Sequence, residues 1–237
     1  MSASVSAISN FSLALAFLPA LLVIAIMYYW RAGGGTAIYA TLRMLAQLLM
    51  IGYVLVYIFD ADHWGVIVAV LLVMLVAASW IAIRTVDSPE PRTYVVAFVA
   101  VSVSGVPILF LVTQAVIGVE PWFMPRYVVP LGGMIFSGSM TAISIAAERL
   151  AAELRSGCSW ENARRTAFNT AMIPIVNSLF AVGLVSLPGM MTGQVLSGVS
   201  PLIAAKYQII VMTMLFGATG TAAAIYLALD KSHLKRP

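Results

Sequence analysis

The chain has 237 residues, of which 62% are apolar and 9% charged, and its mean hydropathy is +0.99. Soluble domains carry about 25% charged residues, so this composition excludes a soluble globular protein and indicates an integral membrane protein. In a membrane protein, a net charge of +4 indicates which loops face the cytoplasm and predicts contact with anionic lipid. We therefore expect no nucleic-acid partner. A single cysteine excludes a disulfide framework within the chain and a cysteine-based metal cluster.

Apolar runs of about 20 residues predict seven transmembrane helices. Residues 1–10 are uncharged and lack the basic start of a cleaved signal peptide, so the first run is predicted to be a retained span. The predicted spans lie near residues 9–30, 37–59, 65–84, 94–117, 128–149, 172–196 and 204–229. No linker separates a soluble domain, so the sequence predicts an all-α polytopic membrane protein with one transmembrane domain over residues 1–237.

Basic residues alternate between the predicted loops. The odd-numbered loops and the C-terminal tail hold ten of the thirteen Lys and Arg. Because cytoplasmic loops are enriched in Lys and Arg, we expect the N-terminus outside and the C-terminus in the cytoplasm.

The sixth predicted span contains several helix-breaking residues. The stretch from 185 to 206 includes Pro188, Gly189, Gly193, Gly198 and Pro201. Broken backbone at membrane depth is tolerated where it is buried in protein or lines a cavity. The sequence therefore predicts a helix broken near Pro188 that lines a transport pathway.

The fifth loop, from Glu148 to Ala171, is the one extended cytoplasmic segment that we predict. Its apolar residues from Trp160 to Ala171 recur at helical spacing, with Ser159 as the expected N-cap. This amphipathic segment, at about 150–171, either rests on anionic lipid or docks in a groove of a cytoplasmic partner. Both alternatives place Trp160 on the apolar side of the helix.

Two polar residues lie one turn apart in the second predicted span. Burying a cationic side chain such as Arg43 in a membrane costs free energy, so its presence there indicates a functional role. The alternative is that Arg43 extends its side chain to the cytoplasmic interface. Gln47 needs a hydrogen bond to another helix, which can be purely structural.

The fifth predicted span is rich in small residues between Pro130 and Ser139. This pattern favours close helix packing or dimer formation, and the alternative is a permeation path. The methionines nearby and in the broken span are either flexible packing or ligands of a soft metal such as Cu(I). They are Met134, Met140, Met190 and Met191.

Catalytic signatures are absent from the sequence. It contains no phosphate-binding loop, and its two histidines, His63 and His233, belong to no zinc motif. No Asp or Glu lies in the middle of a predicted span, which disfavours a proton- or sodium-coupled carrier. A retinal protein is excluded because Lys206 begins the last span and no acidic counter-ion lies at mid-span.

Three blocks of sequence resemble the FetB-type iron-export permeases of ABC transporters. They are Arg43–Tyr53, Arg126–Met140, and the segment from Pro174 to Gln208, which contains Ser-Leu-Pro-Gly-Met-Met-Thr-Gly. The resemblance covers nearly the whole chain and is strongest from Arg126 to Gln208. One departure is Ser139, where the family usually has Asn.

The resemblance implies a multi-pass permease of the bacterial inner membrane that pairs with a separate cytoplasmic ABC ATPase. Bacterial members are tied to iron export and oxidative-stress resistance, and plant relatives to aluminium tolerance, so the resemblance implies a role in metal homeostasis. ATP and Mg²⁺ would bind the partner ATPase, with no cofactor on this chain, and two copies of the chain would form one transporter. Transport would proceed by alternating access.

The residues predicted to serve this function fall into two groups. The predicted translocation pathway comprises Arg43, Gln47, Met134, Ser137, Ser139, Asn177, Pro188, Gly189, Met190, Met191, Thr192 and Gln194. The predicted ATPase-coupling residues are Gly157, Trp160, Glu161, Arg164 and Arg165. The alternative function is a passive metal-ion channel, or a receptor that uses the same loop for a signalling partner.

Overall fold

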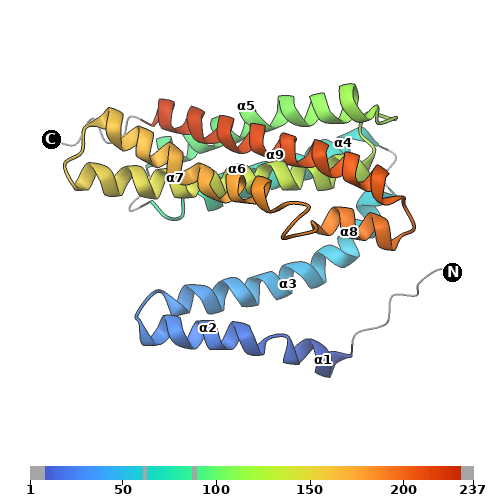
Figure 1. Cartoon of the computed structure of the whole chain (residues 1–237), viewed down its shortest axis with the longest axis horizontal. Coiled ribbons are helices and arrows are strands. Elements are labelled where there is room, and N and C mark those ends of the chain that lie inside the picture. Colours follow the sequence, from blue (N-terminus) through green and yellow to red (C-terminus); the bar gives the residue numbers. More distant parts are fainter. Residues whose placement is uncertain (1–8, 61–62, 87–89, 231–237) are drawn as a thin grey trace. The chain divides into compact units, whose positions relative to one another are not determined.

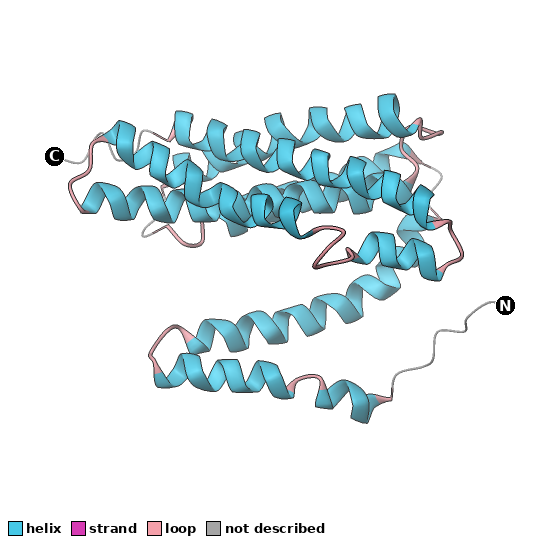
Figure 2. Ribbon diagram, in the orientation of Figure 1, coloured by secondary structure: helices cyan, strands magenta, loops and turns pink. Residues whose placement is uncertain are grey.

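A computed structural model describes residues 9–60, 63–86 and 90–230. Throughout these residues the regular secondary structure is helical, apart from one isolated bridge between Val182 and Ser186 (Figure 2). The chain divides into two compact units, Met1–Asp60 and Ala61–Pro237, and the single transmembrane domain stays a prediction. Each unit is described by itself.

The first unit is a helical hairpin. It contains α1 (Asn10–Leu15), α2 (Leu18–Tyr29) and α3 (Gly34–Phe59), and α2 packs against α3. The predicted first span is therefore divided into two helices. Pro19 lies in the first turn of α2, where its missing N–H and fixed φ suit a helix start and not a continuing helix.

The second unit is a bundle of long helices around α6. Its elements are α4 (Trp64–Ala82), α5 (Pro91–Phe110), the π-helix η1 (Leu111–Ile117), α6 (Pro125–Arg155), α7 (Trp160–Ala181), α8 (Gly189–Leu196) and α9 (Pro201–Leu229). Helix α6 contacts α4, α5, α7 and α9, and these helices run side by side in Figure 1. Helix α8 packs on α9.

Small residues bring the helices of the bundle close together. A Cβ on Gly132 of α6 would lie 2.8 Å from the Leu71 side chain of α4, and one on Gly105 of α5 would lie 2.9 Å from Ile135. Hydroxyl groups add interhelical hydrogen bonds, since Ser144 Oγ of α6 donates to the Ala82 carbonyl at 2.8 Å. Close packing through small and hydroxylated residues is typical of membrane helix bundles.

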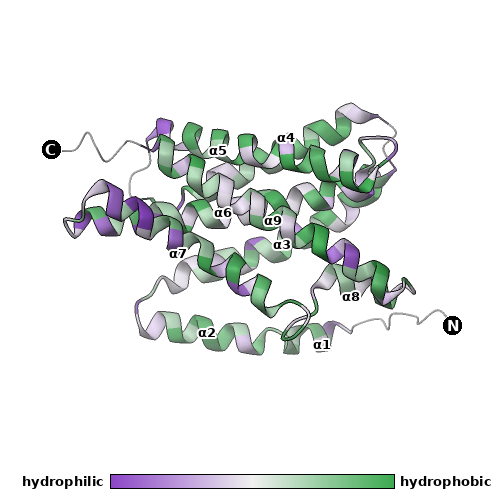
Figure 3. Ribbon diagram, turned by 45° about the horizontal axis from the view of Figure 1, so that its top comes forward, coloured by the Kyte–Doolittle hydropathy of each residue, from purple (hydrophilic) through white to green (hydrophobic). Residues whose placement is uncertain are grey.

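Six helical segments of the described residues are long and apolar enough to cross a membrane. They are Asn10–Tyr29, Gly34–Phe59, Trp64–Ala82, Pro91–Ile117, Pro125–Arg155 and Pro201–Leu229. The α7–α8 segment is not among them, because α7 begins with a charged half and α8 has only eight residues (Figure 3). The protein is thus an all-α, multi-pass membrane protein, and the total of seven spans stays a prediction.

The connection between α6 and α7 is much shorter than the predicted loop of 24 residues from Glu148 to Ala171. Only residues 156–159 lie outside the two helices, because residues 148–155, half of which are charged, continue α6. A Schellman turn ends α6: the N–H of Gly157 donates to Leu154 and that of Cys158 to Glu153, both at 3.1 Å. Gly157 has a φ of 85°, which glycine adopts without strain.

Candidate translocation groove

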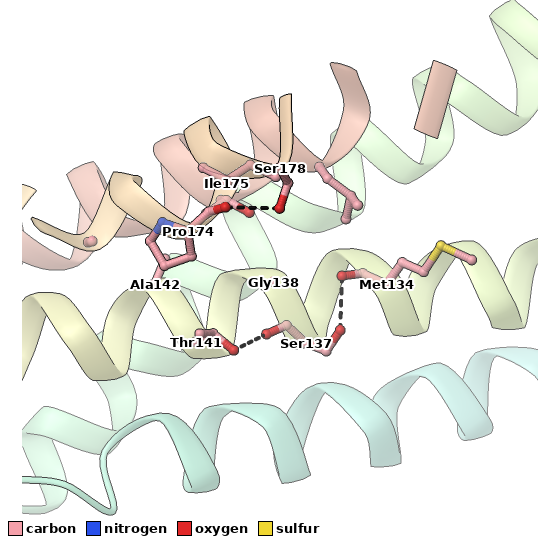
Figure 4. Close-up of a pocket in the computed structure, with 11 residues that line it drawn as sticks. Met134, Ser137, Gly138, Thr141, Ala142, Pro174, Ile175 and Ser178 are labelled. Atoms are coloured by element: carbon pink, nitrogen blue, oxygen red, sulfur yellow. Dashed lines mark hydrogen bonds between the residues drawn. The ribbon is translucent and has the colours of Figure 1, made fainter. Parts of the chain in front are cut away.

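A groove with a volume of about 300 Å³ lies between α6, α7 and α9 (Figure 4). Helix α6 contributes one wall, α7 the opposite wall, and Leu215 and Thr219 of α9 complete it. The residues from α6 are Met134, Ser137, Gly138, Thr141 and Ala142, and those from α7 are Ala171, Pro174, Ile175 and Ser178.

The hydroxyl groups of Ser137, Thr141, Ser178 and Thr219 give the groove its polar character. Ser137 Oγ donates to the Met134 carbonyl at 3.1 Å, and Thr141 Oγ1 donates to the Ser137 carbonyl at 2.9 Å. Ser178 Oγ donates to the Pro174 carbonyl at 2.9 Å, and Figure 4 shows all three bonds. Because a hydroxyl has one proton and two lone pairs, the oxygens of these three residues keep acceptor capacity after donating their protons.

The groove contains no ionisable side chain among its lining residues. In the described part of the chain, no group of three or more His, Cys, Asp or Glu could hold a metal ion. Any cation that passes the groove would therefore meet hydroxyl oxygens, carbonyl oxygens and the Met134 thioether, without charge neutralisation from a carboxylate.

The break after α7 is a compact turn. The Ala181 carbonyl accepts the amide N–H groups of Leu184, Val185 and Ser186 at 2.8–3.2 Å. Gly183 has a φ of 84°, and its N–H donates to the Ser186 carbonyl at 3.0 Å. The backbone of the turn is thus hydrogen-bonded locally.

Helix α8 begins directly after Pro188, which is its N-cap residue. The Pro188 carbonyl accepts both the N–H and the Oγ1–H of Thr192, at 3.0 and 3.1 Å. On the same helix Gln194 has a buried Oε1 with no hydrogen-bond partner. The predicted interruption near Pro188 is confirmed, and it extends from residue 182 to 188.

The structure does not bring the predicted pathway residues together in one site. Met134 and Ser137 line the groove, and Met191 lines a second cavity between α7, α8 and α9. Ser139 is fully buried and donates to the Ala218 carbonyl of α9 at 3.5 Å, so it does not face the groove. Asn177 is exposed on α7 next to Ser178. Arg43 and Gln47 lie on α3 of the other unit, and Pro188, Gly189, Met190, Thr192 and Gln194 lie at or in α8.

Sequence reasoning missed Thr141 and Thr219 of the groove. Thr141 lies one turn after Ser137 on α6, so helical spacing predicts that the two side chains share one face of the helix. Thr219 is on α9, and only the close approach of α9 to Gly138 brings it to the site: a Cβ on Gly138 would lie 3.0 Å from Thr219 Oγ1.

The first half of α7 is amphipathic, as predicted. Ala163, Ala167 and Ala171 are buried, whereas Glu161, Arg164, Arg165 and Asn169 are exposed. Trp160 is half-buried. Ser159 is the N-cap residue, as predicted, although its side chain makes no capping hydrogen bond.

A cavity of about 440 Å³ adjoins this charged surface, between α7 and the last turns of α9. Its lining combines the polar residues Glu161, Arg164 and Arg165 with apolar ones. The apolar lining residues are Phe168, Ala224, Leu227 and Ala228. The segment from Gly157 to Arg165 therefore lies at one end of α7, beyond the groove residues of the same helix.

Residues 10–234 match the model of the uncharacterised protein family UPF0014. The chain belongs to this family. It is 31% identical over 250 residues to the probable iron export permease protein FetB of Escherichia coli, covering 97% of this chain and 94% of that protein. No solved structure matches the chain.

Other relatives come from bacteria and plants. The UPF0014 membrane protein YjkA of Bacillus subtilis is 33% identical over 193 residues, which is 74% of each chain. The protein ALUMINUM SENSITIVE 3 of Arabidopsis thaliana is 31% identical over 199 residues, which is 78% of this chain and 71% of the relative. Membership together with six spanning-type helices makes this chain a multi-pass membrane protein of a family that includes a probable permease.

Proposed function

We propose that this chain is the permease subunit of an ABC transporter that exports iron or another metal by ATP-driven alternating access. A separate cytoplasmic ATPase would bind and hydrolyse ATP–Mg²⁺. The proposal is supported by the similarity to FetB over nearly the full length of both proteins. It also rests on the resemblance of three sequence blocks to that permease type.

The observation that carries the proposal is the continuity of α7. This helix runs unbroken from Trp160 to Ala181. Arg164 and Arg165 are exposed near its start, and Pro174, Ile175 and Ser178 line the groove farther along. At 1.5 Å per residue, about 20 Å separates Arg165 from Ser178 along the axis. A force on the charged end would therefore be transmitted to the groove along one continuous helix, in which Pro174 is an interior residue.

We further propose that two copies of the chain form the pathway. Ser137, Thr141, Asn177 and Ser178 are exposed along α6 and α7. Hydrocarbon cannot solvate polar side chains well, so these residues favour a protein or aqueous neighbour over lipid. A second copy placed against this face would enclose the groove, and two copies would match the two docking sites of an ATPase dimer.

Co-purification and ATPase stimulation test the proposal. The chain is purified with a candidate ABC ATPase, and hydrolysis is measured with and without it. We expect R164E/R165E to weaken the complex and abolish stimulation, because both changes reverse the charge of the exposed end of α7. The control is R84E/R92E, which makes the same charge change at two exposed arginines that bound the α4–α5 connection.

Transport in inside-out vesicles tests the substrate. We expect ATP-dependent uptake of iron that is lost in R164E/R165E and retained in R84E/R92E. Ion flux through the purified chain without any ATPase would instead identify a passive channel and refute the proposal.

A further inference from the structure

The cavity of about 440 Å³ between α7 and the last turns of α9 has a charged wall. Its lining residues from α7 are Glu161, Arg164, Arg165 and Phe168. They occupy positions i, i+3, i+4 and i+7 of the helix, and residues at this spacing share one face. The three charged side chains therefore belong to the face of α7 that borders the cavity.

The two arginines of this wall have no partner within the described part of the chain. Neither Arg164 nor Arg165 forms an ion pair or a side-chain hydrogen bond there, although Glu161 lies one turn away on the same helix. A guanidinium group has five N–H donors in a planar fork that matches two oxygens of a phosphate. The wall thus offers an anion a positive charge and donors that no other side chain uses.

The opposite wall of the cavity is apolar. It consists of Ala224, Leu227 and Ala228 of α9, and Phe168 of α7 adjoins it. A small inorganic anion would leave this apolar surface in contact with water, whereas a hydrocarbon chain attached to the anion would cover it and gain free energy. The two walls together therefore favour an amphipathic anion.

The cavity lies at one end of a spanning-type helix. Helix α9 has 29 residues, so that it is about 44 Å long at 1.5 Å per residue. A bilayer is about 40–45 Å thick when its headgroups are included. Ala224, Leu227 and Ala228 belong to the last two turns of α9, so they lie at the level of the lipid headgroups. The charge distribution predicts that this is the cytoplasmic side, where anionic lipids attract basic segments.

The charge of the lining narrows the choice of anion. Two arginines and one glutamate give the lining a net charge of +1. A phosphodiester with one negative charge balances this charge. A zwitterionic lipid leaves it uncompensated, and a multivalent phosphate exceeds it. The Glu161 carboxylate accepts hydrogen bonds, which suits a headgroup that carries hydroxyl groups.

We infer that the α7–α9 cavity binds an anionic phospholipid with one negative charge, of the phosphatidylglycerol type. Its phosphodiester pairs with Arg164 and Arg165, a headgroup hydroxyl donates to Glu161, and an acyl chain covers the apolar wall. The same arginines serve the proposed coupling to an ATPase, but lipid binding needs no ATPase and is measured on this chain alone.

The test is a titration of the purified full chain in detergent, with bound molecules counted by native mass spectrometry. The probes are phosphatidylglycerol, phosphatidylcholine with the same acyl chains, and glycerophosphoglycerol, which is the first headgroup without acyl chains. We expect the first phosphatidylglycerol to bind about tenfold or more tightly than either of the other probes, because charge-assisted hydrogen bonds and apolar contact act together.

Two variants test the two walls. R164Q/R165Q should remove the preference for phosphatidylglycerol over phosphatidylcholine. R84Q/R92Q, which loses the same charge at two exposed arginines outside the cavity lining, should retain it. A224W keeps both arginines of the cavity and fills its apolar side, so it should weaken phosphatidylglycerol binding by about tenfold. The control is A46W, at an exposed alanine of α3.

A photoreactive phosphatidylglycerol locates the site on the unaltered chain, even if a variant does not fold. We expect its cross-links within residues 161–168 or 224–228. Equal affinity for the two lipids, or cross-links confined to other segments, would overturn the inference. Equally tight binding of glycerophosphoglycerol would replace the lipid by a soluble phosphodiester and would overturn it too. A lack of ATPase stimulation would leave the lipid result unchanged, so failure of the transport proposal is distinguishable from failure of this one.

Discussion

Gly138 of α6 lies directly against Thr219 of α9, so that a Cβ at position 138 would be 3.0 Å from Thr219 Oγ1. Both residues line the groove between α6, α7 and α9. The distance is shorter than an ordinary van der Waals contact, so the spacing between the two helices depends on the missing side chain. The width of the groove at this level is thus set by one glycine.

We expect G138A to destabilise the protein by about 1–3 kcal/mol, the usual cost of overpacking, although Ala is the better helix former. T219A should relieve the contact, so G138A/T219A should be more stable than the sum of the single changes predicts. Thermal unfolding in detergent measures both. G52A is the control, since a Cβ at Gly52 of α3 meets nothing within 4 Å. Additive effects of G138A and T219A would contradict the proposed contact.

Ser139 occupies a position at which FetB-type permeases usually have Asn, and substitutions there test what this difference does to stability. Its side chain is fully buried and reaches the Ala218 carbonyl at 3.5 Å, so the bond is long and weak. We expect S139A to change stability by less than about 1 kcal/mol. S139N, which restores the usual family residue, should cost about 1–3 kcal/mol because a larger amide must enter a closed site. A stabilised S139N would show that the α6–α9 interface has room that the structure does not give it.

The long helices and the break near Pro188 could be predicted from the sequence because they depend on local composition. The buried stripe of Ala163, Ala167 and Ala171 also follows from helical spacing alone. The length of α6 could not be predicted by hydropathy, because residues 148–155 are charged enough to end an apolar run. They are nevertheless good helix formers, and the helix continues until the turn at Gly157.

Most residues of the candidate site could not be predicted from the sequence, because the packing of helices distant in sequence brings them together. Ser137 and Met134 were predicted from their span, but Ser139, two residues from Ser137, points to α9 because a helix turns by 100° per residue. Gln208 ends the third block that resembles FetB-type permeases, but nothing in the sequence indicated that its side chain is buried. That burial depends on how α7, α8 and α9 pack together, which only the assembled bundle determines.

The turn after α7 should be sensitive to its left-handed glycine. Gly183 has a φ of 84° and an N–H that donates to Ser186. A residue with a Cβ costs about 1–2 kcal/mol in this conformation. We expect G183A to lower the melting temperature and to speed amide hydrogen exchange of residues 184–186. G189A is the control, because Gly189 has no positive φ and nothing lies within 4 Å of its Cβ position. Equal protection in G183A and the unaltered chain would show that the turn tolerates another conformation.

Cys158 provides a direct test of the predicted orientation. It is the single cysteine of the chain, and it is exposed in the turn between α6 and α7, where its Sγ donates to Glu153 Oε2 at 3.2 Å. The charge distribution predicts that this turn faces the cytoplasm. A membrane-impermeant maleimide should therefore label inside-out vesicles and leave right-side-out vesicles unlabelled until detergent is added. C158S should show no labelling in either preparation. Labelling of right-side-out vesicles would reverse the orientation and place the charged end of α7 on the side opposite to an ATPase.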